Sequence, residues 1–313
     1  MQRWKGTWVH DALGAWMILW CYAPIVAAAA LFSRHPNALT FALAFVISAT
    51  RQNALFVVAH ESWHYTLFRS RRANVVLGTW LAAFPILLPW AQARHLHLEH
   101  HRKVGTANDP DRYAWGWQLA ERGPWVRHML AVATGLPFAS RVARIALRLP
   151  PPPADPLRPR PVAPPELRGR GELAKLVFVQ IVIGAAFTAT IGWPWFFAFW
   201  VAPLLTLRLV VDEVRQFLEH REGRLVVYHA NPLERFALGA FNFHLHAVHH
   251  VFASEPWFCL GALESKALAK RPEIAQHGSY AVELFAYLRG TPRMAAEVSR
   301  PDEAGSASSN TVS

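Results

Sequence analysis

Long runs of apolar residues alternate with short polar connections along most of the chain. The first run covers residues 13–32 and the second residues 38–59, with a polar connection at residues 33–37 between them. At a rise of about 1.5 Å per helical residue, twenty residues span about 30 Å, the thickness of the hydrocarbon core of a bilayer. Each run therefore predicts a membrane-spanning helix, and the short connection predicts that the two helices form a hairpin.

The second half of the chain shows the same pattern. Apolar runs cover residues 173–191 and 193–211, and only Gly192-Trp193-Pro194 marks the turn between them. So short a turn predicts a tight second hairpin. Between the hairpins, residues 74–90 are apolar but contain two prolines and have basic flanks. This stretch is marginal for a full crossing, so we expect a re-entrant or interfacial helical hairpin instead.

Amphipathic and low-complexity segments complete the organisation. Residues 138–149 place three arginines on one helical face and apolar residues on another, which predicts a helix on the membrane surface. A second amphipathic helix is expected at residues 280–288. Nine of the sixteen residues 150–165 are proline, which predicts an extended, semi-rigid linker without helix. We therefore expect one domain, residues 1–296, followed by a disordered polar tail, residues 297–313.

Composition supports a membrane protein. The chain is 53% apolar with 14 tryptophans, and such aromatic residues are typical of membrane interfaces. Its net charge of +11 comes from basic residues beside the apolar runs, which favours anionic membrane lipids as partners and not nucleic acid. The first apolar run is expected to be retained, because no convincing cleavage signal follows it. With only two cysteines, one of them Cys21 inside an apolar run, a cysteine-based metal site is excluded.

The distribution of basic residues predicts the orientation. Lysine and arginine are concentrated at the N-terminus, between residues 69 and 175, and after residue 208, whereas the two opposite turns contain only Arg34. The positive-inside rule then places both termini in the cytoplasm. The expected fold is an all-α integral membrane protein, with four transmembrane helices in two hairpins, interfacial helices, and a helical cap in the cytoplasm.

Histidine clusters are the candidate chemistry of this cap. Box one contains His60 and His64; the other clusters share an H-x-x-H-H spacing, with box two formed by His97, His100 and His101 and box three by His246, His249 and His250. Residues i, i+3 and i+4 of a helix lie on one face, so each cluster can direct its imidazoles at one point. Imidazole is a ligand for iron, zinc, copper and nickel. The charge pattern predicts all three boxes on the cytoplasmic side.

A ninth candidate ligand follows the fourth apolar run. His220 lies one or two turns beyond it, with Gln216 one turn earlier on the same face. Nine nitrogen ligands exceed the four to six that one ion uses, so two ions are expected. Zinc usually takes three or four ligands, often with cysteine, and has no redox chemistry; an oxygen-activating di-iron site fits better. His95 and His244 lie on other helical faces and are expected to donate or accept hydrogen bonds.

Polar residues near the boxes allow two interpretations. Arg51, Gln52 and Asn53 fall in the later half of the second apolar run, where they are costly in lipid. Either the helix emerges from the membrane there, or these groups support the site that begins at His60, and we expect both. Three glutamates, Glu61, Glu99 and Glu219, lie in or beside the boxes. Each is either a hydrogen-bond partner of a ligand or a solvated helix residue.

The three boxes resemble those of the membrane fatty acid desaturase superfamily. The matching motifs are His60-Glu61-Ser62-Trp63-His64, His97-Leu98-Glu99-His100-His101 and His246-Ala247-Val248-His249-His250. Arg94 before box two, the run from Gly105 to Asp111 after it, and Pro256-Trp257 after box three also resemble the family. The Gln216-x-x-x-His220 element is similar to the Asn-x-x-x-His element of animal acyl-CoA desaturases, with Gln216 in place of Asn. The resemblance covers roughly residues 10–290.

The resemblance implies a mechanism. Two iron ions would reduce the co-substrate O2 with electrons from a donor protein, and hydrogen would be removed from an unactivated C–H bond. By analogy, one iron would be bound by histidines from boxes one and two together with His220, and the other by the remaining histidines. Gln216, Asn242 and the three glutamates are candidates to support the ligands. Asp109 and Asp111 are expected to anchor a box or cap a helix.

Partners and substrate follow from the same resemblance. No H-P-G-G haem motif occurs, so the expected electron donor is a separate ferredoxin, rubredoxin or cytochrome. Arg102, Lys103 and Arg215 either dock an acidic donor or only enforce topology. We expect a desaturase acting on a fatty acyl chain or similar lipid in a bacterial inner membrane. The alternatives are a hydroxylase or ketolase acting on a carotenoid or other hydrophobic substrate and, less favoured, a metal transporter.

Overall fold

The protein is described by a computed structural model that covers residues 2–116, 122–150, 162–167, 171–220 and 223–290. Most of the predicted proline-rich linker and the predicted tail, residues 297–313, lie outside the described residues. The helical prediction is confirmed. Within the described part of the chain, four helices are long and apolar enough to cross a membrane, which indicates a multi-pass membrane protein.

The first hairpin consists of two long helices, α1 (Trp8–Arg34) and α2 (Ala38–Trp63). Asn37 sets the start of α2 through a capping box. Its Oδ1 atom accepts from the Thr40 amide at 3.0 Å, and Thr40 Oγ1 accepts from the Asn37 amide at 3.2 Å. These bonds satisfy amide groups that have no partner inside the helix. The α2 helix extends four residues beyond the predicted apolar run, which brings box one to its end.

The second hairpin begins with α8 (Glu172–Thr190) and turns back at Gly192, whose φ of 104° favours glycine. The returning span, Trp193–Glu219, is not one uniform helix. It comprises α9 (Trp193–Phe196), the π-helical segment η6 (Phe197–Val201), α10 (Ala202–Leu205) and α11 (Leu207–Glu219). Like α2, it continues past the predicted apolar run, and His220 follows its last turn.

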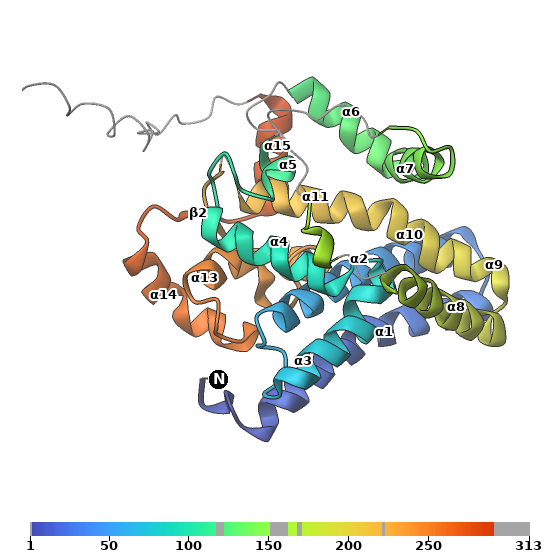
Figure 1. Cartoon of the computed structure of the whole chain (residues 1–313), viewed down its shortest axis with the longest axis horizontal. Coiled ribbons are helices and arrows are strands. Elements are labelled where there is room, and N and C mark those ends of the chain that lie inside the picture. The colour runs from blue at the N-terminus through green and yellow to red at the C-terminus, as the bar shows by residue number, and fades with distance from the viewer. Residues whose placement is uncertain (1, 117–121, 151–161, 168–170, 221–222, 291–313) are drawn as a thin grey trace, which may run out of the picture.

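The segment between the hairpins is bent, as its prolines predict. It contains α3 (Arg71–Gly78), the π-helical η2 (Thr79–Ala83), the 3-10 helix η3 (Phe84–Ile86) and α4 (Trp90–Lys103). Leu87 has a φ of 61°, and the chain turns by 93° between Arg71–Ile86 and Trp90–Lys103. The bend directs α4, which contains box two, away from α3 and towards the end of α2 (Figure 1).

The remaining elements form the cap. They are η1 (Gln2–Trp4), α5 (Arg112–Trp115), α6 (Arg122–Ala133), α7 (Leu136–Ala146), η5 (Pro165–Leu167), α12 (Pro232–Ala237), η8 (Ala240–Leu245), α13 (His246–Val251), η9 (Trp257–Cys259), α14 (Leu260–Lys270) and α15 (Tyr280–Arg289). The amphipathic helices expected at residues 138–149 and 280–288 correspond to α7 and α15. The expectation of no helix in residues 150–165 is wrong at its last residue, because a short 3-10 turn begins at Pro165.

Two short strands depart from the all-α expectation. The strands β1 (Val226–Tyr228) and β2 (Ala275–His277) pair in parallel, with Val227 opposite Gln276. Backbone bonds continue the pairing at both ends, from the His229 amide to the His277 carbonyl (2.8 Å) and from the Ala275 amide to the Leu225 carbonyl (3.1 Å). Three-residue segments are too short for a periodic sequence signal, so this pairing was not predicted.

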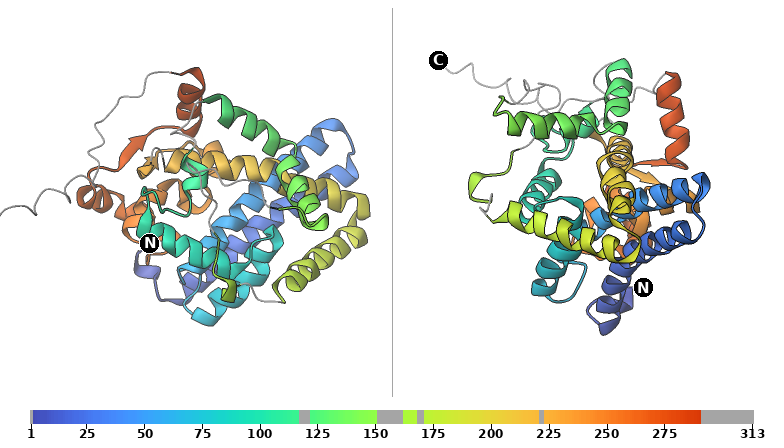
Figure 2. Two further views of the ribbon diagram at one scale, coloured as in Figure 1. Left: turned by 45° about the horizontal axis from the view of Figure 1, so that its top comes forward. Right: turned by 90° about the vertical axis from the view of Figure 1, so that its right-hand side faces the viewer.

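The arrangement places the far turn of the second hairpin and the elements of box three on opposite sides of the molecule. In Figure 1 the turn between α8 and α9 lies at the right, whereas α13 and α14 lie at the left, with α4 and α11 running between the two regions. The two views of Figure 2 show α6 and α15 on the same side of α11. A buried cluster that includes Met17, Leu55 and Trp200 fills the space among the spans and reaches Phe243, next to box three. The apolar core thus continues up to the histidines.

Candidate metal centre

Box one lies at the C-terminal end of α2. His60 is in the last turn of the helix and His64 is its C-cap residue. The helix ends there because Tyr65 takes a left-handed conformation, with φ of 60°, and the Thr66 amide donates back to the Glu61 carbonyl at 3.0 Å. The spacing i, i+4 places the two imidazoles one above the other on the side of α2 that faces the cap.

Box two occupies the last two turns of α4, which ends before Gly105. His100 is fully buried, and its Nδ1 atom lies 2.7 Å from Oδ1 of Asp109. The same carboxylate accepts hydrogen bonds from the amides of Gly105 (3.0 Å) and Asp111 (2.9 Å) and from the Trp115 indole (3.0 Å). The expectation that Asp109 anchors a box is therefore confirmed: it ties His100 to the loop that follows α4.

Box three begins in a strained turn. In η8, Phe241 and Asn242 both have left-handed backbone angles, with φ of 54° and 60°. Left-handed angles are unfavourable for residues other than glycine and occur mostly where the surrounding structure enforces them. The turn reverses the chain, so that the short helix α13 presents His246, His249 and His250 to the other boxes.

His220 completes the set at the end of α11. It is the C-cap residue of that helix, and its amide donates to the Gln216 carbonyl at 3.2 Å. Its ring centroid lies 4.6 Å from that of His100 and 5.3 Å from that of His246. The sequence prediction that His220 lies at the level of the boxes is confirmed.

The nine histidines form two adjacent groups. The first contains His60, His64, His97, His101 and His249; the second contains His100, His220, His246 and His250. Within each group the candidate ligand atoms all lie within 4.8 Å of one another. The division expected by analogy is wrong for two histidines: His220 is grouped with His246 and His250 of box three, and His249 of box three is grouped with box one. The neighbouring positions His100 and His101 of box two belong to different groups.

In the first group, four Nε2 atoms form a closed ring. The separations are 2.7 Å for His64–His97, 2.9 Å for His97–His101, 3.2 Å for His101–His249 and 3.1 Å for His249–His64. In a neutral imidazole each ring nitrogen carries either a proton or a lone pair, so hydrogen bonds alone cannot satisfy four such contacts. Neighbouring ligands at right angles, each about 2.1 Å from one ion, would lie about 3.0 Å apart, which matches the ring.

The second group shows the same convergence. His250 Nε2 lies 3.1 Å from His246 Nε2 and 3.3 Å from His100 Nε2. In the first group, both ring nitrogens of His60 are buried without a hydrogen-bond partner. Buried polar atoms normally have partners, so an orphaned imidazole beside four converging nitrogens favours a bound cation. The residues present therefore fit two metal ions with nitrogen ligands.

Burial makes these imidazoles neutral. Burial, with a smaller contribution from Arg94, lowers the pKa of His64 to about 4. Burial, with smaller contributions from His64 and His100, lowers the pKa of His101 to about 2. Burial also lowers the pKa values of His97, His220, His246, His249 and His250 well below the ordinary value. His100 differs: burial lowers its pKa, but Asp111 and Asp109 outweigh that effect and raise it. Neutral imidazoles keep the lone pairs that metal binding requires.

The predicted supporting residues have different environments. Oε2 of Glu61 accepts from the Trp257 amide (3.1 Å) and the Thr66 hydroxyl (2.8 Å), which joins box one to the loop after box three. Glu99 instead forms ion pairs with Arg102 and Lys103 on the outer side of α4. Asn242 lies in the strained turn, where its amide donates to the Trp257 carbonyl at 3.2 Å. Gln216 is buried one turn before His220.

An ion network below His220 was not predicted. Arg215 is 1% exposed and donates to Oε2 of Glu219 (2.5 Å) and to Oδ1 of Asp212 (2.9 Å). The Tyr280 hydroxyl donates to Oε1 of Glu219 at 2.8 Å. The expectation that Arg215 helps to dock an electron donor is therefore wrong. Its spacing of i−3 and i+4 to the two carboxylates was the available signal, because these positions share a helix face.

Arg215 also acts on the boxes through Phe243. The guanidinium carbon lies 4.5 Å from the centroid of that ring, and the ring lies 4.9 Å from His60 and 4.5 Å from His246. The network therefore packs, through Phe243, against His60 of the first group and His246 of the second. His244, which was expected to form hydrogen bonds, is buried, and its Nδ1 atom lies 3.4 Å from the Gly239 carbonyl oxygen.

Comparison with known proteins places this geometry in context. The sequence profile of the fatty acid desaturase family matches residues 36–280, which include all three boxes and His220. The chain is 25% identical over 262 residues to an sn-1 acyl-lipid omega-3 desaturase (ferredoxin) from a Synechocystis species, covering 76% of this chain and 69% of the relative. It is 33% identical over 99 residues to a beta-carotene ketolase from a Paracoccus species, covering 30% of this chain and 39% of the ketolase.

Proposed function

Because the chain belongs to the fatty acid desaturase family, whose profile matches 36–280, we propose that it is an O2-dependent di-iron oxidoreductase that introduces a double bond into a fatty acyl chain or related lipid. The observation that supports this most directly is the pair of adjacent, buried histidine groups. A further support is the similarity to an acyl-lipid desaturase over most of both chains.

Under this proposal, each histidine group holds one iron. His60, His64, His97, His101 and His249 bind the first, and His100, His220, His246 and His250 bind the second. When bound, the two irons supply the reduction of O2 and the removal of hydrogen from an unactivated C–H bond. Burial by the surrounding side chains keeps the imidazoles neutral. Asp109 accepts a hydrogen bond from Nδ1 of His100, which leaves Nε2 of that histidine free to bind metal.

The protein also excludes water and positions the substrate. His60, His100 and His249 are at most 1% exposed, and the apolar cluster among the spans ends at Phe243 against box three. We propose that the acyl chain approaches from this apolar side, because the membrane supplies it and the spans lead to the histidines. Burial from water would protect the reactive centre from side reactions.

Electrons come from a separate donor under this proposal. Ferredoxin, rubredoxin and a cytochrome are the candidates, and the Synechocystis relative is named as a ferredoxin-type desaturase. Arg102 and Lys103 follow His101 directly at the end of α4, with 68% and 44% of their side chains exposed. They offer an acidic donor a docking position next to the first histidine group. We place this face in the cytoplasm of a bacterial cell, following the positive-inside rule.

A second candidate is a ketolase or hydroxylase acting on a carotenoid or another hydrophobic substrate. It is favoured by the 33% identity to a beta-carotene ketolase, although that match covers only 99 residues. A metal transporter is disfavoured, because the nine histidines converge in two compact, largely buried groups, whereas transporters use loose histidine loops or isolated ligands along a pathway.

Metal analysis followed by product analysis tests the proposal. The purified protein is expected to hold two irons per chain, and a host expressing it together with a ferredoxin and its reductase is expected to accumulate more unsaturated acyl chains. Well under two irons per chain, or zinc in their place, would overturn the di-iron assignment. An unchanged acyl profile together with a new oxygenated pigment would replace the desaturase by the ketolase.

A further inference from the structure

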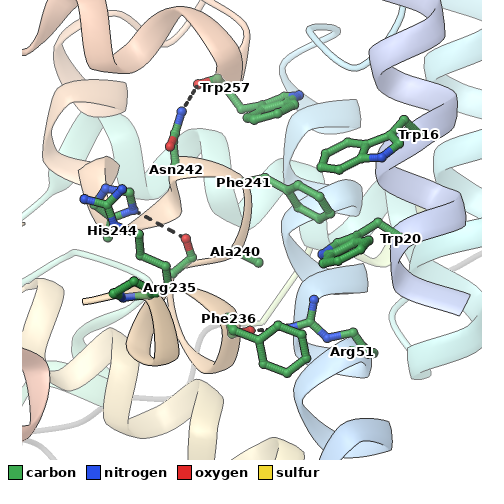
Figure 3. Close-up of a pocket in the computed structure, with 12 residues that line it drawn as sticks. Trp16, Trp20, Arg51, Arg235, Phe236, Ala240, Phe241, Asn242, His244 and Trp257 are labelled. Atoms are coloured by element: carbon green, nitrogen blue, oxygen red, sulfur yellow. Dashed lines mark hydrogen bonds between the residues drawn. The ribbon is translucent and has the colours of Figure 1, made fainter. Parts of the chain in front are cut away.

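A pocket lies outside the histidine groups, between α1, α2 and the segment from α12 to η9. Its volume is about 320 Å³. Figure 3 shows its walls: Trp16, Trp20 and Trp257 on one side, Arg235 and His244 on the other, and Arg51 beside Phe236 at one end. Ligand pockets in proteins begin at about 300 Å³. The volume therefore suits a small polar group and not a complete acyl chain.

Aromatic rings form a continuous wall of this pocket. Trp16 stacks on Trp20 at 5.7 Å and on Trp257 at 6.0 Å, and Phe241 meets both Trp16 and Trp257 edge to face at 5.6 Å. Trp16 is 43% exposed and Trp20 is 40% exposed, so the wall continues onto the outer surface of the α1 span. A chain that left the pocket along these two rings would enter the lipid.

Arg51 is the unusual residue of the site. It lies fourteen residues after Asn37, or about 21 Å along α2, which is within the hydrocarbon thickness of about 30 Å. The side chain is fully buried; Nη2 donates to the Phe236 carbonyl, whereas Nε and Nη1 have no hydrogen-bond partner. Its guanidinium carbon lies 3.7 Å from the centroid of the Phe236 ring, and no carboxylate among the described residues forms an ion pair with it.

Such a cation needs a counter-ion. A buried charge without a partner is strongly unfavourable, and ionisable residues inside membrane spans usually mark a ligand or ion site. A second cation faces the same pocket: Arg235 uses Nε to donate to the Ala230 carbonyl at 2.8 Å, and the remainder of its guanidinium lies beside His244 (Figure 3). The site therefore combines two guanidinium groups with an aromatic wall that leads into the membrane.

We propose that this pocket binds the oxyanion head group of a membrane amphiphile, a phosphate or a carboxylate. The exposed Arg235 contacts the anion, the buried charge of Arg51 attracts it from the end of the pocket beside Phe236, and the first part of the apolar chain lies along Trp16 and Trp20. Guanidinium groups suit both anions, because their planar donors match two oxygens of one group. The inference is independent of which reaction the histidine centre performs.

The η8 turn connects the pocket to the metal centre. Phe241, Asn242 and His244 line the pocket, whereas Phe243, between them, packs against His60 and His246. A bound head group would contact the strained part of this turn, where Phe241 and Asn242 have left-handed angles. Occupancy of the pocket would therefore stabilise the turn that presents box three.

Lipid titration of the full-length protein tests the proposal. Delipidated protein in detergent is titrated with dioleoylphosphatidylglycerol, with oleate, and with the neutral counterparts dioleoylglycerol and monoolein, and binding is followed by native mass spectrometry. At least one anionic probe is expected to bind one molecule per chain about tenfold more tightly than its neutral counterpart. Phosphatidylglycerol alone would identify a phospholipid head group, and oleate alone a free carboxylate. Equal binding of anionic and neutral probes would overturn the proposal.

Variants assign the binding to this pocket. Arg235→Gln and Arg51→Gln are each expected to weaken the anionic probe about tenfold, whereas Arg72→Gln, which removes an exposed arginine at the start of α3, is not. If Arg51→Gln fails to fold, the exposed Arg235 keeps the test decisive. Trp20→Ala is expected to weaken binding, with Trp8→Ala as the control, since Trp8 is 73% exposed on the same helix and does not line the pocket. Unchanged affinity in both Arg235→Gln and Trp20→Ala would reject the site.

Discussion

His100 and Asp109 form the most completely bonded pair at the centre. The Nδ1–Oδ1 distance is 2.7 Å, both side chains are fully buried, and Asp109 accepts three further hydrogen bonds from the loop after α4. The carboxylate therefore fixes both the tautomer and the orientation of one imidazole. It does so for a histidine whose neighbour, His101, belongs to the other group. A single loop thus fixes the relative position of the two metal groups.

Replacing Asp109 tests this role. Asp109→Asn keeps the shape but removes the charge, and we expect metal affinity to fall by about 10- to 100-fold, because partners of ligating histidines typically contribute that much. Iron per chain, measured after dialysis against a graded chelator series, checks the prediction. Asp11→Asn, which alters an exposed ion pair with Arg69, is the control. Equal iron retention in both variants would show that Asp109 only closes the loop.

Two histidine substitutions test the choice of ligands. His249 Nε2 lies 3.1 Å from His64 and 3.2 Å from His101, in the closed ring of nitrogens, whereas His277 is in β2 and pairs with Glu283 at 2.7 Å. We expect His249→Ala to abolish product formation and to lower the iron content, and His277→Ala to preserve both. Product analysis and iron content of the purified variants check this. Equal loss in the two variants would mean that the ligand assignment is wrong.

The composition of the site could be predicted, but its division could not. Helical spacing indicated the eight box histidines as candidates because i, i+3 and i+4 positions share a face, and His220 was added from its place after the fourth apolar run. The spacing does not show which helix faces pack against one another. The assignment of His100 and His101 to different groups therefore required the structure. For Asp109, anchoring a box was one of two expected roles, capping a helix being the other, and the bond to His100 supports the first.

The buried ion network around Arg215 could not be predicted from the sequence either. Arg215 was expected on a basic face, either to dock a donor or only to enforce topology, yet it is buried and paired with Asp212 and Glu219, and Tyr280 donates to Glu219. The carboxylates precede and follow it on one helix, but Tyr280 is distant in sequence and its approach depends on the fold. The apolar runs predicted the spans well, because membrane thickness sets their length; the extensions of α2 and α11 into the cap are polar and left no such signal.

The metal-free protein is expected to lose stability on acidification. Burial lowers the pKa of His64 to about 4 and that of His101 to about 2, from an ordinary value near 6.5. Below pH 6.5 the unfolded chain binds protons that these folded histidines do not, so the free energy of unfolding falls with pH. His100, whose pKa is raised, acts in the opposite direction, but the lowered histidines outnumber it. The unfolding temperature in detergent should therefore fall between pH 7 and pH 5.

Bound metal is expected to raise the unfolding temperature of the folded protein. If the two groups hold iron as proposed, the metal would bind the neutral imidazoles of the folded protein, so loaded protein should have a higher unfolding temperature than the metal-free protein at pH 7. The His64→Ala variant, measured without metal, should lose part of the acid sensitivity. An unfolding temperature of the metal-free protein that is constant from pH 7 to pH 5 would contradict the neutral, buried state of the histidines.

The last prediction concerns the backbone contact between the loop after α4 and the loop after α11. Gly105, after box two, has a φ of 79°, and a Cβ atom there would lie 2.3 Å from the carbonyl oxygen of Gly223, which follows His220 by three residues. One loop follows the end of α4 and the other follows the end of α11. The contact between them therefore holds His100 near His220. Gly105→Ala must both strain the backbone and separate the loops, and we expect a destabilisation of about 1–3 kcal/mol. Thermal unfolding of the metal-free variant measures it.

Iron content separates stability from geometry in the same variant. If the contact positions the histidines, Gly105→Ala should also lose metal selectively from the second group, with a stoichiometry that approaches one iron per chain at temperatures where the protein remains folded. Gly278→Ala is the matched control, because a Cβ atom there meets nothing within 4 Å. A lower unfolding temperature with two irons retained would assign the glycine pair to stability alone. Loss of iron without a change in unfolding temperature would show that the loops act on His100 and His220 directly.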